Sequence, residues 1–522
     1  MPTINTRRYA LDQAKRRLFP TVTNFPGMGA LERSLLSHEW KPTMLANPPA
    51  GSGLRPVLGD AGLPVLGHLI ELFRGGPDYV LRLYRSHGPL VYFRHYPAPV
   101  VLAIGPDATE AIYGNSNQDF SQRGWDPVIG PFFRGGLTLL DFDEHRHHRR
   151  IMQQDFTRAR LSDHVAHIDQ IATHALAHEW AADDPRFLLH PAMKVLALDI
   201  ASVIFMGCEP GSDSRELAKV HRAFTATTTG GEAIVRTSVP PFKWWRGLRG
   251  RVVLEDYFMA RVRERRYGSV EAFESGARGS GTDMLAALCR AEDEDGNRFT
   301  DEDVVAHLIF LMMAADDAVT SAVTAISYRL AANQDWQDRV RDESAQLGDG
   351  PVDIDGLETL KSLDLVMNES LRLDTPLPFS VRQTVRDTDL LGYHLPGGTN
   401  VTTWPSVNHR LSELWTDPMT FDPDRFLEPR AEHKNHRYAF APWGGGAHKC
   451  IGMVFSQLEV KTIMHRMLRR YRLELPHPGY RARWNYAGLP VPTDGMPIAL
   501  RPLTRRPLTR RPLTRRPLKR TR

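Results

Sequence analysis

The chain has 522 residues, of which 42% are hydrophobic and 24% are charged. This hydrophobic content can bury a large core, so the composition excludes an intrinsically disordered protein. The formal net charge is +5, but ten Lys and Arg residues and no acidic residue fall within residues 501–522. The first 500 residues therefore carry a net charge of −5, which gives no support to nucleic-acid binding by the folded part.

Three cysteines, Cys208, Cys289 and Cys450, are spread along the chain. A low, odd count argues against a disulfide framework and fits a reducing compartment. The sequence shows no signal-peptide pattern and no apolar run of the roughly 18 residues that a membrane span needs. We therefore expect a cytoplasmic protein without a transmembrane segment. The basic, amphipathic segment 9–19 leaves open a peripheral contact with a membrane surface; a solvated helix is the alternative.

In chain order, the apolar periodicity predicts a helix-dominated chain with a smaller β portion. Residues 1–47 form a weakly patterned lead-in, and 48–67 are too rich in Pro and Gly for a helix. The elements predicted after them are a helix over 68–87, strands at 90–94 and 99–103, a helix after the turn at 104–107, interrupted helices over 144–208, a loop at 276–281, an apolar helix over 302–332, a helix over 364–373, short strands and turns over 380–445, and a helix from about 450 to 471.

The chain ends in a repeat. RPLTR recurs from residue 501, four times if the final, degraded RPLKR is counted. A five-residue period with Pro in every unit fits neither a helix nor a strand, so residues 501–522 are expected to be a disordered cationic tail. Such a tail can contact an anionic membrane or nucleic acid; an extension unrelated to function is the alternative.

The segment PWGGGAHKCIG, residues 442–452, carries the most chemical information. Cys450 follows three glycines, Gly452 comes two residues later, and a predicted helix lies behind them. Glycine adopts positive φ and lets the backbone approach a flat ligand closely. Backbone N–H groups near the sulfur and the start of the next helix would stabilise a thiolate. The alternative is a Gly-rich helix start with an incidental cysteine.

This segment resembles the haem-binding loop of the cytochromes P-450. That family's pattern is an aromatic residue, Gly, a basic residue, the ligand Cys and Gly, and these places are occupied by Trp443, Gly446, His448, Cys450 and Gly452. Family members usually have Phe in the first place. The resemblance implies a haem b (iron protoporphyrin IX) cofactor, with Cys450 as the iron ligand and His448 contacting a haem propionate.

A second match is Glu369-Ser-Leu-Arg372, which resembles the family's E-x-x-R helix. The i, i+3 spacing places both side chains on one face. A buried ion pair needs every donor satisfied, and Arg425 in FDPDRF resembles the third member of this group. In the family the trio is structural.

Further matches resemble the family's propionate contacts. They are His145 and Arg149, in a basic cluster that alone would suit a solvated helix face, and Arg382. Residues 56–69 resemble the family's Pro- and Gly-rich entrance. The resemblance covers about residues 48–500 and implies the P-450 fold: mainly α with a smaller β portion, one large domain, and the haem between a distal oxygen-binding helix and the proximal Cys loop.

The stretch MMAADDAVTS, residues 312–321, resembles the oxygen-binding helix, in which a small pair is followed by any residue, an acid and Thr. Ala314 and Ala315 match the small pair, and Asp317 matches the acid. Together with Asp316, Ala315 and Asp317 are the candidate catalytic residues. Two aspartates on a helix surface are the alternative.

The place of the usual Thr is taken by Ala318, which has no hydroxyl. Thr320 lies about 200° further round the helix and should face elsewhere. Three explanations stay open: a substrate hydroxyl positions a water, Asp316 or Asp317 acts through water alone, or the enzyme is not an efficient oxygenase. We expect poorer coupling of electrons to product than in an Ala318→Thr variant.

The resemblance implies a monooxygenase that uses O2 to oxidise a lipophilic small molecule such as a steroid, terpenoid or fatty acid. The candidate contacts come mainly from loops, including the regions near Phe224 and at 239–245, and core packing is the alternative for each. They are Trp125, Ile129, Phe132, Met313 and Leu489.

About 70 residues follow Cys450, and they contain no flavin domain and no iron–sulfur cysteine spacing. Electrons are therefore expected from a separate ferredoxin and its reductase, docking near Lys434, Arg437 and Lys449. This arrangement resembles bacterial soluble members, including sterol-demethylase-like ones. Two other functions stay open: a peroxide-driven oxidase or isomerase, suggested by Ala318, and a non-catalytic haem protein that binds a lipid or gas.

Overall fold

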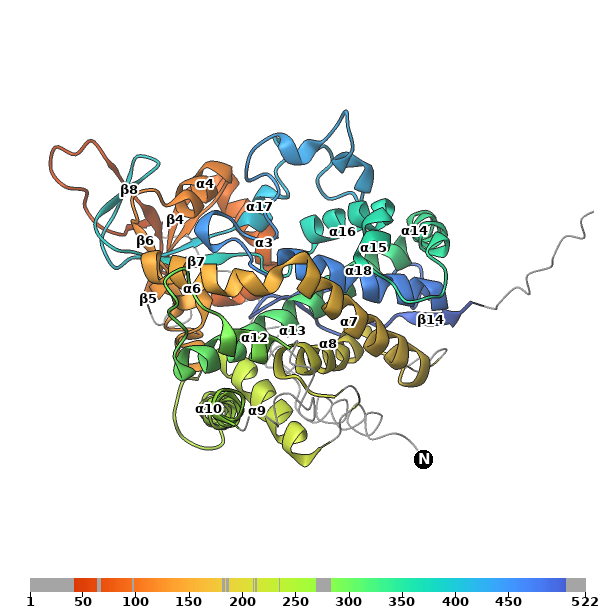
Figure 1. The fold of residues 1–522 in the computed structure, drawn as a ribbon. Helices are drawn as coiled ribbons and strands as arrows, with labels where there is room; N and C mark the ends of the chain where they lie inside the picture. The colour runs from red at the N-terminus through yellow and green to blue at the C-terminus, as the bar shows by residue number, and fades with distance from the viewer. Residues whose placement is uncertain are drawn as a thin grey trace, which may run out of the picture.

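The computed structural model describes residues 42–62, 67–95, 98–180, 184, 187–209, 211, 214–233, 235–268 and 283–503. A sheet-rich part lies at the left of Figure 1, and helices make up most of the rest. The expected fold class, mainly α with a smaller β portion, is confirmed.

The largest sheet has seven strands in the order β1-β3-β4-β5-β10-β7-β6. Strand β10 pairs parallel to β5 and antiparallel to β7, so that Val401 lies opposite both Val101 and Arg382. The strands are β1 (Pro42–Met44), β3 (Leu58–Asp60), β4 (Leu90–His95), β5 (Ala98–Ala103), β6 (Phe120–Ser121), β7 (Ser380–Thr384) and β10 (Asn400–Thr403). Early and late parts of the chain thus share one sheet, and that sheet fixes the strand that carries Arg382.

Three smaller sheets complete the β portion. They pair β2 (Arg55–Pro56) with β9 (Tyr393–Leu395) and β8 (Thr388–Leu390), β11 (Tyr471–Glu474) with β14 (Ala499–Pro502), and β12 (Trp484–Asn485) with β13 (Val491–Pro492). Strand β14 includes Arg501 and Pro502, which the repeat pattern had assigned to a disordered tail. Likewise β1 lies within the predicted lead-in. Paired strands therefore extend beyond both predicted limits, residues 48 and 500.

The central helix is α13 (Asp301–Ala332), which crosses the middle of Figure 1. It begins with a capping box: the Thr300 hydroxyl accepts from the Asp303 N–H at 3.1 Å, and the Asp303 carboxylate accepts from the Thr300 N–H at 3.1 Å. Most of its length is apolar and buried. Helices α8 (Leu189–Met206), α16 (Lys361–Leu373) and α18 (Met453–Arg470) pack against it.

The remaining helices surround this centre. They are α3 (Leu69–His87), α4 (Pro106–Gly114), α5 (Gly130–Phe133), α6 (Phe142–Gln153), α7 (Arg158–His178), α9 (Arg215–Gly231), α10 (Lys243–Tyr267), α12 (Met284–Arg290), α14 (Gln334–Gln346), α15 (Ile354–Thr359) and α17 (Pro405–Asn408). Short 3-10 helices are η2 (Gln122–Trp125), η3 (Leu137–Leu139), η4 (Gln154–Phe156), η5 (Pro423–Phe426), η6 (Glu432–Lys434) and η7 (Gly446–His448).

Two helices among the described residues, α8 and α13, are long and apolar enough to cross a membrane, with a mean hydropathy of 1.5 over 18 residues. In each, 72% of that window is buried inside the protein. A buried helix of this composition is what a protein core requires, so the two helices are weak indications of a membrane span.

Most predicted elements are confirmed, including the strands near 90 and 100, the apolar helix that became α13 and the helix after Cys450. Helices α9 and α10 were missed, as were the shorter helices α12, α14 and α15. The region 239–245 was expected to be a loop, but α10 begins at Lys243, so Trp244 and Trp245 stand in its first turn. The predicted segments 9–19 and 276–281, and residues 504–522 of the tail, lie outside the described residues.

Candidate active site

The Cys450 loop is held closed by its own backbone. The Cys450 N–H donates to the Trp443 carbonyl at 2.9 Å, and the Gly452 N–H donates to the Cys450 sulfur. Helix α18 begins directly after this turn, at Met453. The loop therefore presents the thiol with one backbone donor already aimed at it, as the glycine pattern predicted.

Positive φ is required at two of the glycines in this loop, Gly444 (φ 70°) and Gly446 (φ 63°). At Gly446 a Cβ would also lie 1.8 Å from the Tyr113 carbonyl oxygen. Gly452 differs, since its φ is −88° and a Cβ there would meet nothing closer than Phe156, at 3.8 Å. Gly446 is thus fixed by sterics, whereas Gly452 contributes its N–H to the sulfur.

The Cys450 side chain is exposed, yet burial raises the pKa of its thiol. Both facts hold together if the thiol lines a hollow inside the protein. The Gly452 N–H, Arg149 and Lys449 act in the opposite direction and favour the thiolate. Burial is the larger of these opposing effects on the pKa of the thiol. A bound metal cation would supply the missing positive charge.

Four basic side chains gather beside the loop: His145 of α6, Arg149 of α6, Arg382 of β7 and His448 of η7. The rings of His145 and His448 are 3.8 Å apart, centroid to centroid. Burial, together with Arg149 and Arg382, lowers the pKa of His145 to about 4. Burial, Arg382, His145 and Arg149 lower the pKa of His448 to about 2.

This cluster fits the group that the resemblance implies. The neighbours that act on His145 and His448 are basic, and none is a carboxylate. The Nδ1 atom of His145 is buried and has no hydrogen-bond partner among the described residues. His145 and Arg382 are buried, and an acid, Asp141, acts on Arg382. A mainly basic set of donors suits a ligand with carboxylates, and the adjacent thiol suits an iron. Both features match a haem with its two propionates.

Glu369, Arg372 and Arg425 meet in one buried network. Arg372 donates from Nε and Nη2 to the Glu369 carboxylate at 2.7 and 2.8 Å, and Arg425 donates to the same carboxylate at 3.2 Å. Arg425 also donates to Glu432 at 2.7 Å, a partner that the motif did not indicate. Backbone carbonyls, including those of His409 and Thr416, accept the remaining donors. The network ties α16 to the segment before the Cys loop.

On α13 the predicted oxygen-side residues divide between two faces. Ala314 is exposed, and Ala315, Asp317 and Ala318 are partly exposed. Asp316 is buried with a side-chain exposure of 0%. Thr320 is also buried, and its hydroxyl has no hydrogen-bond partner among the described residues. Asp317 and Ala318 therefore share the accessible side, while Thr320 does not replace the missing hydroxyl.

The sequence missed Lys194 of α8, which joins the two aspartates. Its Nζ lies 2.6 Å from Asp316 Oδ2 and also donates to Asp317 Oδ1. Burial alone would lower the pKa of Lys194, but the two carboxylates raise it. A signal was present, because Lys194 is a lone cation within an apolar helix, and a partly buried cation in such a helix calls for an acidic partner.

The candidate substrate residues lie in several elements. Trp125 stacks on Phe379 at a ring distance of 6.1 Å, and the loop of Leu489 is tied to α13 by the bond from Ser321 Oγ to the Pro490 carbonyl at 2.7 Å. Trp125, Ile129, Met313 and Leu489 are partly exposed.

Phe132 differs, because its side chain is fully buried. It packs edge-on against Trp244 at 4.8 Å and beside Gly230 and Gly247, where α9 meets α10. The structure therefore puts Phe132 and Trp244 in helix packing.

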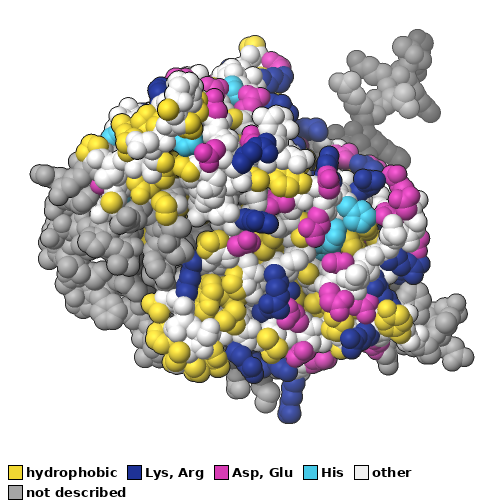
Figure 2. Space-filling view, turned by 90° about the vertical axis from the view of Figure 1, so that its left-hand side faces the viewer, with side chains coloured by type: hydrophobic (Ala, Val, Ile, Leu, Met, Phe, Trp, Pro, Cys, Tyr) yellow, Lys and Arg dark blue, Asp and Glu magenta, His cyan; other side chains and the backbone are white. Residues whose placement is uncertain are grey.

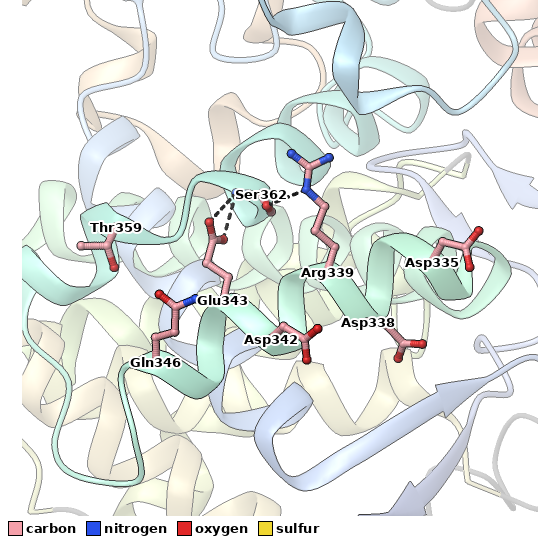
Figure 3. A pocket seen from close by; sticks show the side chains of 8 residues that line it. All are labelled: Asp335, Asp338, Arg339, Asp342, Glu343, Gln346, Thr359 and Ser362. Carbon is pink, nitrogen blue, oxygen red and sulfur yellow. Dashed lines mark hydrogen bonds between the residues drawn. The ribbon is translucent and has the colours of Figure 1, made fainter.

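A separate surface hollow of about 620 Å³ lies over α14 (Figure 3). None of the candidate site residues lines it; its walls are Asp335, Asp338, Arg339, Asp342, Glu343, Gln346, Thr359 and Ser362. The Glu343 carboxylate accepts from the Ser362 N–H at 2.9 Å, at the start of α16. An acid there stabilises the helix N-terminus. Glu343 therefore satisfies an N–H group at the start of the helix that carries Glu369.

Two of the three expected docking cations already have acidic neighbours. Lys434 bonds Glu428, and Arg437 lies 3.8 Å from Glu110, whereas Lys449 is exposed. Among the described residues on the face shown in Figure 2, basic and acidic side chains are interspersed.

Comparison with known proteins gives one consistent family. The family model described as "Cytochrome P450" matches residues 57–484. The Mycobacterium tuberculosis protein named "Putative cytochrome P450 136" is 59% identical over 501 residues, which cover 96% of this chain and 100% of that protein.

More distant relatives include human lanosterol 14-alpha demethylase, 25% identical over 81% of this chain and 82% of that protein. Cyclooctatin synthase of Streptomyces melanosporofaciens is 27% identical over 84% of this chain and 94% of that protein. The fold matches that of a cyanobacterial CYP120A1 solved with retinoic acid, with a TM-score of 0.73, 24% identity, and coverage of 85% of this chain and 99% of that one.

Proposed function

Because the chain belongs to the cytochrome P450 family, whose members are haem-iron monooxygenases, we propose that it oxidises a lipophilic small molecule at a haem b held by Cys450. The observation that carries this proposal is the Cys450 thiol beside the basic cluster of His145, Arg149, Arg382 and His448. The haem domain would span residues 48–500, extended by the strands at either end.

In this proposal each group has a distinct task. Cys450 binds the iron, with Trp443 and the Gly446–Gly452 turn shaping its loop. The four basic side chains hold the propionates through charge-assisted hydrogen bonds. The network of Glu369, Arg372 and Arg425 keeps the loop in position. When bound, the haem-thiolate supplies oxygen activation, because thiolate ligation favours O–O cleavage.

In this proposal the residues of α13 on the oxygen side leave space for the ligand and position groups that transfer protons. Ala314 and Ala315 leave space on the accessible side of α13, and Asp317 holds a carboxyl there. Lys194 donates a hydrogen bond to this carboxyl. Ala318 adds no hydroxyl to position a water, which leaves that task to Asp317, Asp316 or the substrate.

For the substrate we propose a steroid, terpenoid or fatty acid. The partly exposed candidates Trp125, Ile129, Met313 and Leu489 are apolar, which suits such a ligand. The names of the relatives point the same way, since lanosterol is a sterol and retinoic acid is an apolar chain with a carboxylate. Titration of each class against the haem spin state, followed by product analysis, identifies the substrate.

We further propose a cytoplasmic enzyme that receives electrons from a separate ferredoxin and its reductase, with Lys449 at the docking face. The tail would add contacts with anionic surfaces. The second candidate, a peroxide-driven oxidase or isomerase, is favoured by Ala318 alone. Turnover with reduced ferredoxin but not with hydrogen peroxide supports the first function, and the reverse supports the second.

The decisive experiment is the spectrum of the reduced, carbon-monoxide-bound protein. We expect a strongly red-shifted Soret band for the wild type and for Cys289→Ser, a matched control in a buried helix. The band should be lost in Cys450→Ser. A folded, haem-loaded wild type without the shifted band would contradict thiolate ligation by Cys450 and, with it, the proposed function.

A further inference from the structure

The outer face of α14 carries more acids than bases. The hollow over this helix is lined by Asp335, Asp338, Asp342 and Glu343, and Arg339 is the one cation among the described residues that line it. Figure 3 shows these acids along the length of α14. Asp335 and Asp342 are exposed, and neither lies within ion-pair distance of a cation among the described residues. The four acids, called here the acidic face of α14, therefore offer carboxylates to a basic partner.

The chain leaves the described residues beside this helix. Strand β14 pairs with β11, and the Leu503 N–H then donates to the Arg470 carbonyl at 3.0 Å. The carbonyl of the following residue, Tyr471, accepts from Arg341 of α14 at 3.4 Å. Arg341 in turn donates to Asp338. Strand β14 and α14 accordingly lie on the same side of the molecule (Figure 1), and the chain beyond Leu503 starts next to the acidic face.

The two strands at this exit already pair arginines with acids. Arg472 of β11 donates to both carboxylate oxygens of Asp338, at 3.1 and 3.2 Å. Arg501, the first arginine of the RPLTR repeat, donates from Nε to Glu474 at 3.2 Å. The later units of the repeat present the same guanidinium groups. Guanidinium binds carboxylate through a fork of donors, which makes arginine the cation best suited to such pairs.

The chain beyond Leu503 has the charge and the reach that the acidic face requires. Residues 504–522 contain eight arginines, one lysine and no acid. The first two arginines come within three residues of Leu503, a distance of about 10 Å in an extended chain. The aspartates of α14 are spread over a similar distance, about 10 Å at the rise of an α-helix. The first pair of arginines can therefore reach these aspartates.

We propose that residues 504–522 dock on the acidic face of α14, with the arginines nearest Leu503 pairing with Asp335 and Asp342. Because the segment is tethered beside its site, its effective concentration there is about millimolar, which lowers the entropic cost of forming several weak ion pairs. The contact makes binding of the tail to any other anionic surface competitive with α14. It is independent of the chemistry at Cys450, and it names this chain's own helix as the anionic surface that the tail contacts.

A tail that served only to bind a membrane would give different results. The carboxylates of α14 would then stay solvated, and their removal would affect vesicle binding no more than the removal of any other exposed acid. The two roles are therefore separated by the partner of the first arginines and by the effect of the acidic face on membrane binding.

The first test is zero-length carbodiimide cross-linking of the full-length holoprotein, with the links mapped by mass spectrometry. This reagent joins an amine to a carboxylate in direct contact, so Arg505→Lys is used to place an amine near Leu503 without a change of charge. We expect links from position 505 to Asp335, Asp338 or Asp342 at low salt. They should be lost at about 1 M salt, where the Debye length is about 3 Å.

The second test is cosedimentation with vesicles of equal parts phosphatidylcholine and phosphatidylserine. Asp335→Asn/Asp342→Asn should bind about 3- to 10-fold more tightly than the control, which is the combined effect of releasing two exposed ion pairs. The matched control is Asp256→Asn/Asp295→Asn, which removes two exposed acids outside the hollow and changes the net charge equally. After deletion of residues 504–522 the two double variants should no longer differ.

Either of two results overturns the proposal. One is a set of cross-links from position 505 that favours carboxylates outside α14 or is spread evenly over the surface. The other is equal vesicle binding by the α14 variant and its control, which would assign the tail to the membrane. Should no form bind vesicles, the cross-links decide the question. Neither readout needs turnover, so failure of the monooxygenase function would not be mistaken for failure of this contact.

Discussion

Arg372 donates two hydrogen bonds, of 2.7 and 2.8 Å, to the Glu369 carboxylate, and both side chains are completely buried. The carboxylate also accepts from Arg425 and from the Asp422 N–H at 2.9 Å. One buried acid therefore holds two buried guanidinium groups and a turn of the backbone.

Glu369→Gln should leave Arg372 and Arg425 without their shared counter-charge. Breaking one partner of a buried pair costs about 3–5 kcal/mol, so we expect a large fall in the unfolding midpoint and poor haem incorporation. Glu358→Gln is the control, because it removes an exposed partner of Arg158 and should leave both properties unchanged. A Glu369→Gln protein as stable as the wild type would contradict the assigned role.

Two alanine substitutions in the Cys loop should behave oppositely. Gly446→Ala needs a left-handed backbone and places a Cβ 1.8 Å from the Tyr113 carbonyl, so it should abolish haem incorporation. Gly452→Ala meets only Phe156, at 3.8 Å, and keeps its N–H to the sulfur, so haem content should stay near the wild-type level. Haem-to-protein ratios measure both. Equal ratios would mean that the loop can move away from Tyr113.

Ala318→Thr should improve the coupling of electrons to product. The new hydroxyl would stand on the accessible side of α13 beside Asp317, where it can orient a water. Product and hydrogen peroxide per reduced cofactor give the ratio. Val319→Thr is the control, since the same hydroxyl is then placed at a buried position. Identical coupling in wild type and Ala318→Thr would show that this chain needs no hydroxyl at 318.

The stability of the protein should fall on mild acidification because of His307. Its Nε2 lies 2.8 Å from His148 Nδ1, and burial, followed by His148, lowers the pKa of His307 to about 3. Below the ordinary histidine pKa of 6.5, His307 binds a proton in the unfolded chain but stays neutral in the folded protein. The stabilisation is therefore complete above pH 6.5 and declines towards pH 3, by at most about 1.4 kcal/mol per pH unit.

Thermal unfolding between pH 7.5 and 4.5 tests this effect. His307→Gln keeps a polar group that can bond His148 but does not titrate, so the decline with falling pH should be shallower than in the wild type. His477→Gln, at an exposed histidine, should leave the profile unchanged. Parallel profiles for the wild type and His307→Gln would exclude His307 as a source of the acid sensitivity.

Local pattern was sufficient for the helices and strands with strong periodicity, such as α13, and for the loop around Cys450. It failed for α9 and α10. Their contact depends on Gly230 and Gly247, where a Cβ built on either would lie 2.9 Å from the other's Cα. That close approach is a tertiary contact, which local sequence does not reveal. The sequence of α10 itself contains many charged residues and has no clear apolar face.

The residues of the candidate site also fall into those that local sequence indicates and those that only the folded structure brings together. Residues within a motif, such as Glu369 and Arg372, could be named because their spacing places them together. Lys194 could not, because it meets Asp316 and Asp317 only across two helices distant in sequence. Glu432 could not, because it reaches Arg425, seven residues away, through irregular turns that have no regular spacing. Asp316 was named as a possible acid from its place in the motif. Only the packing of α8 against α13 shows that Asp316 faces the interior, whereas Asp317 faces the accessible side.

The pairing of β5 with β10 also dictates when this protein can mature during synthesis. About 300 residues separate β5 from β10, and a similar length separates Arg149 from Cys450. At roughly 5–20 residues per second, a ribosome needs about 15–60 s to cover that distance. Throughout that interval β5, with its apolar Val100, Val101 and Leu102, has one unpaired edge that can associate with other chains. Cofactor capture is consequently a late event, and slow translation or scarce chaperones should cause losses of protein before any defect in catalysis.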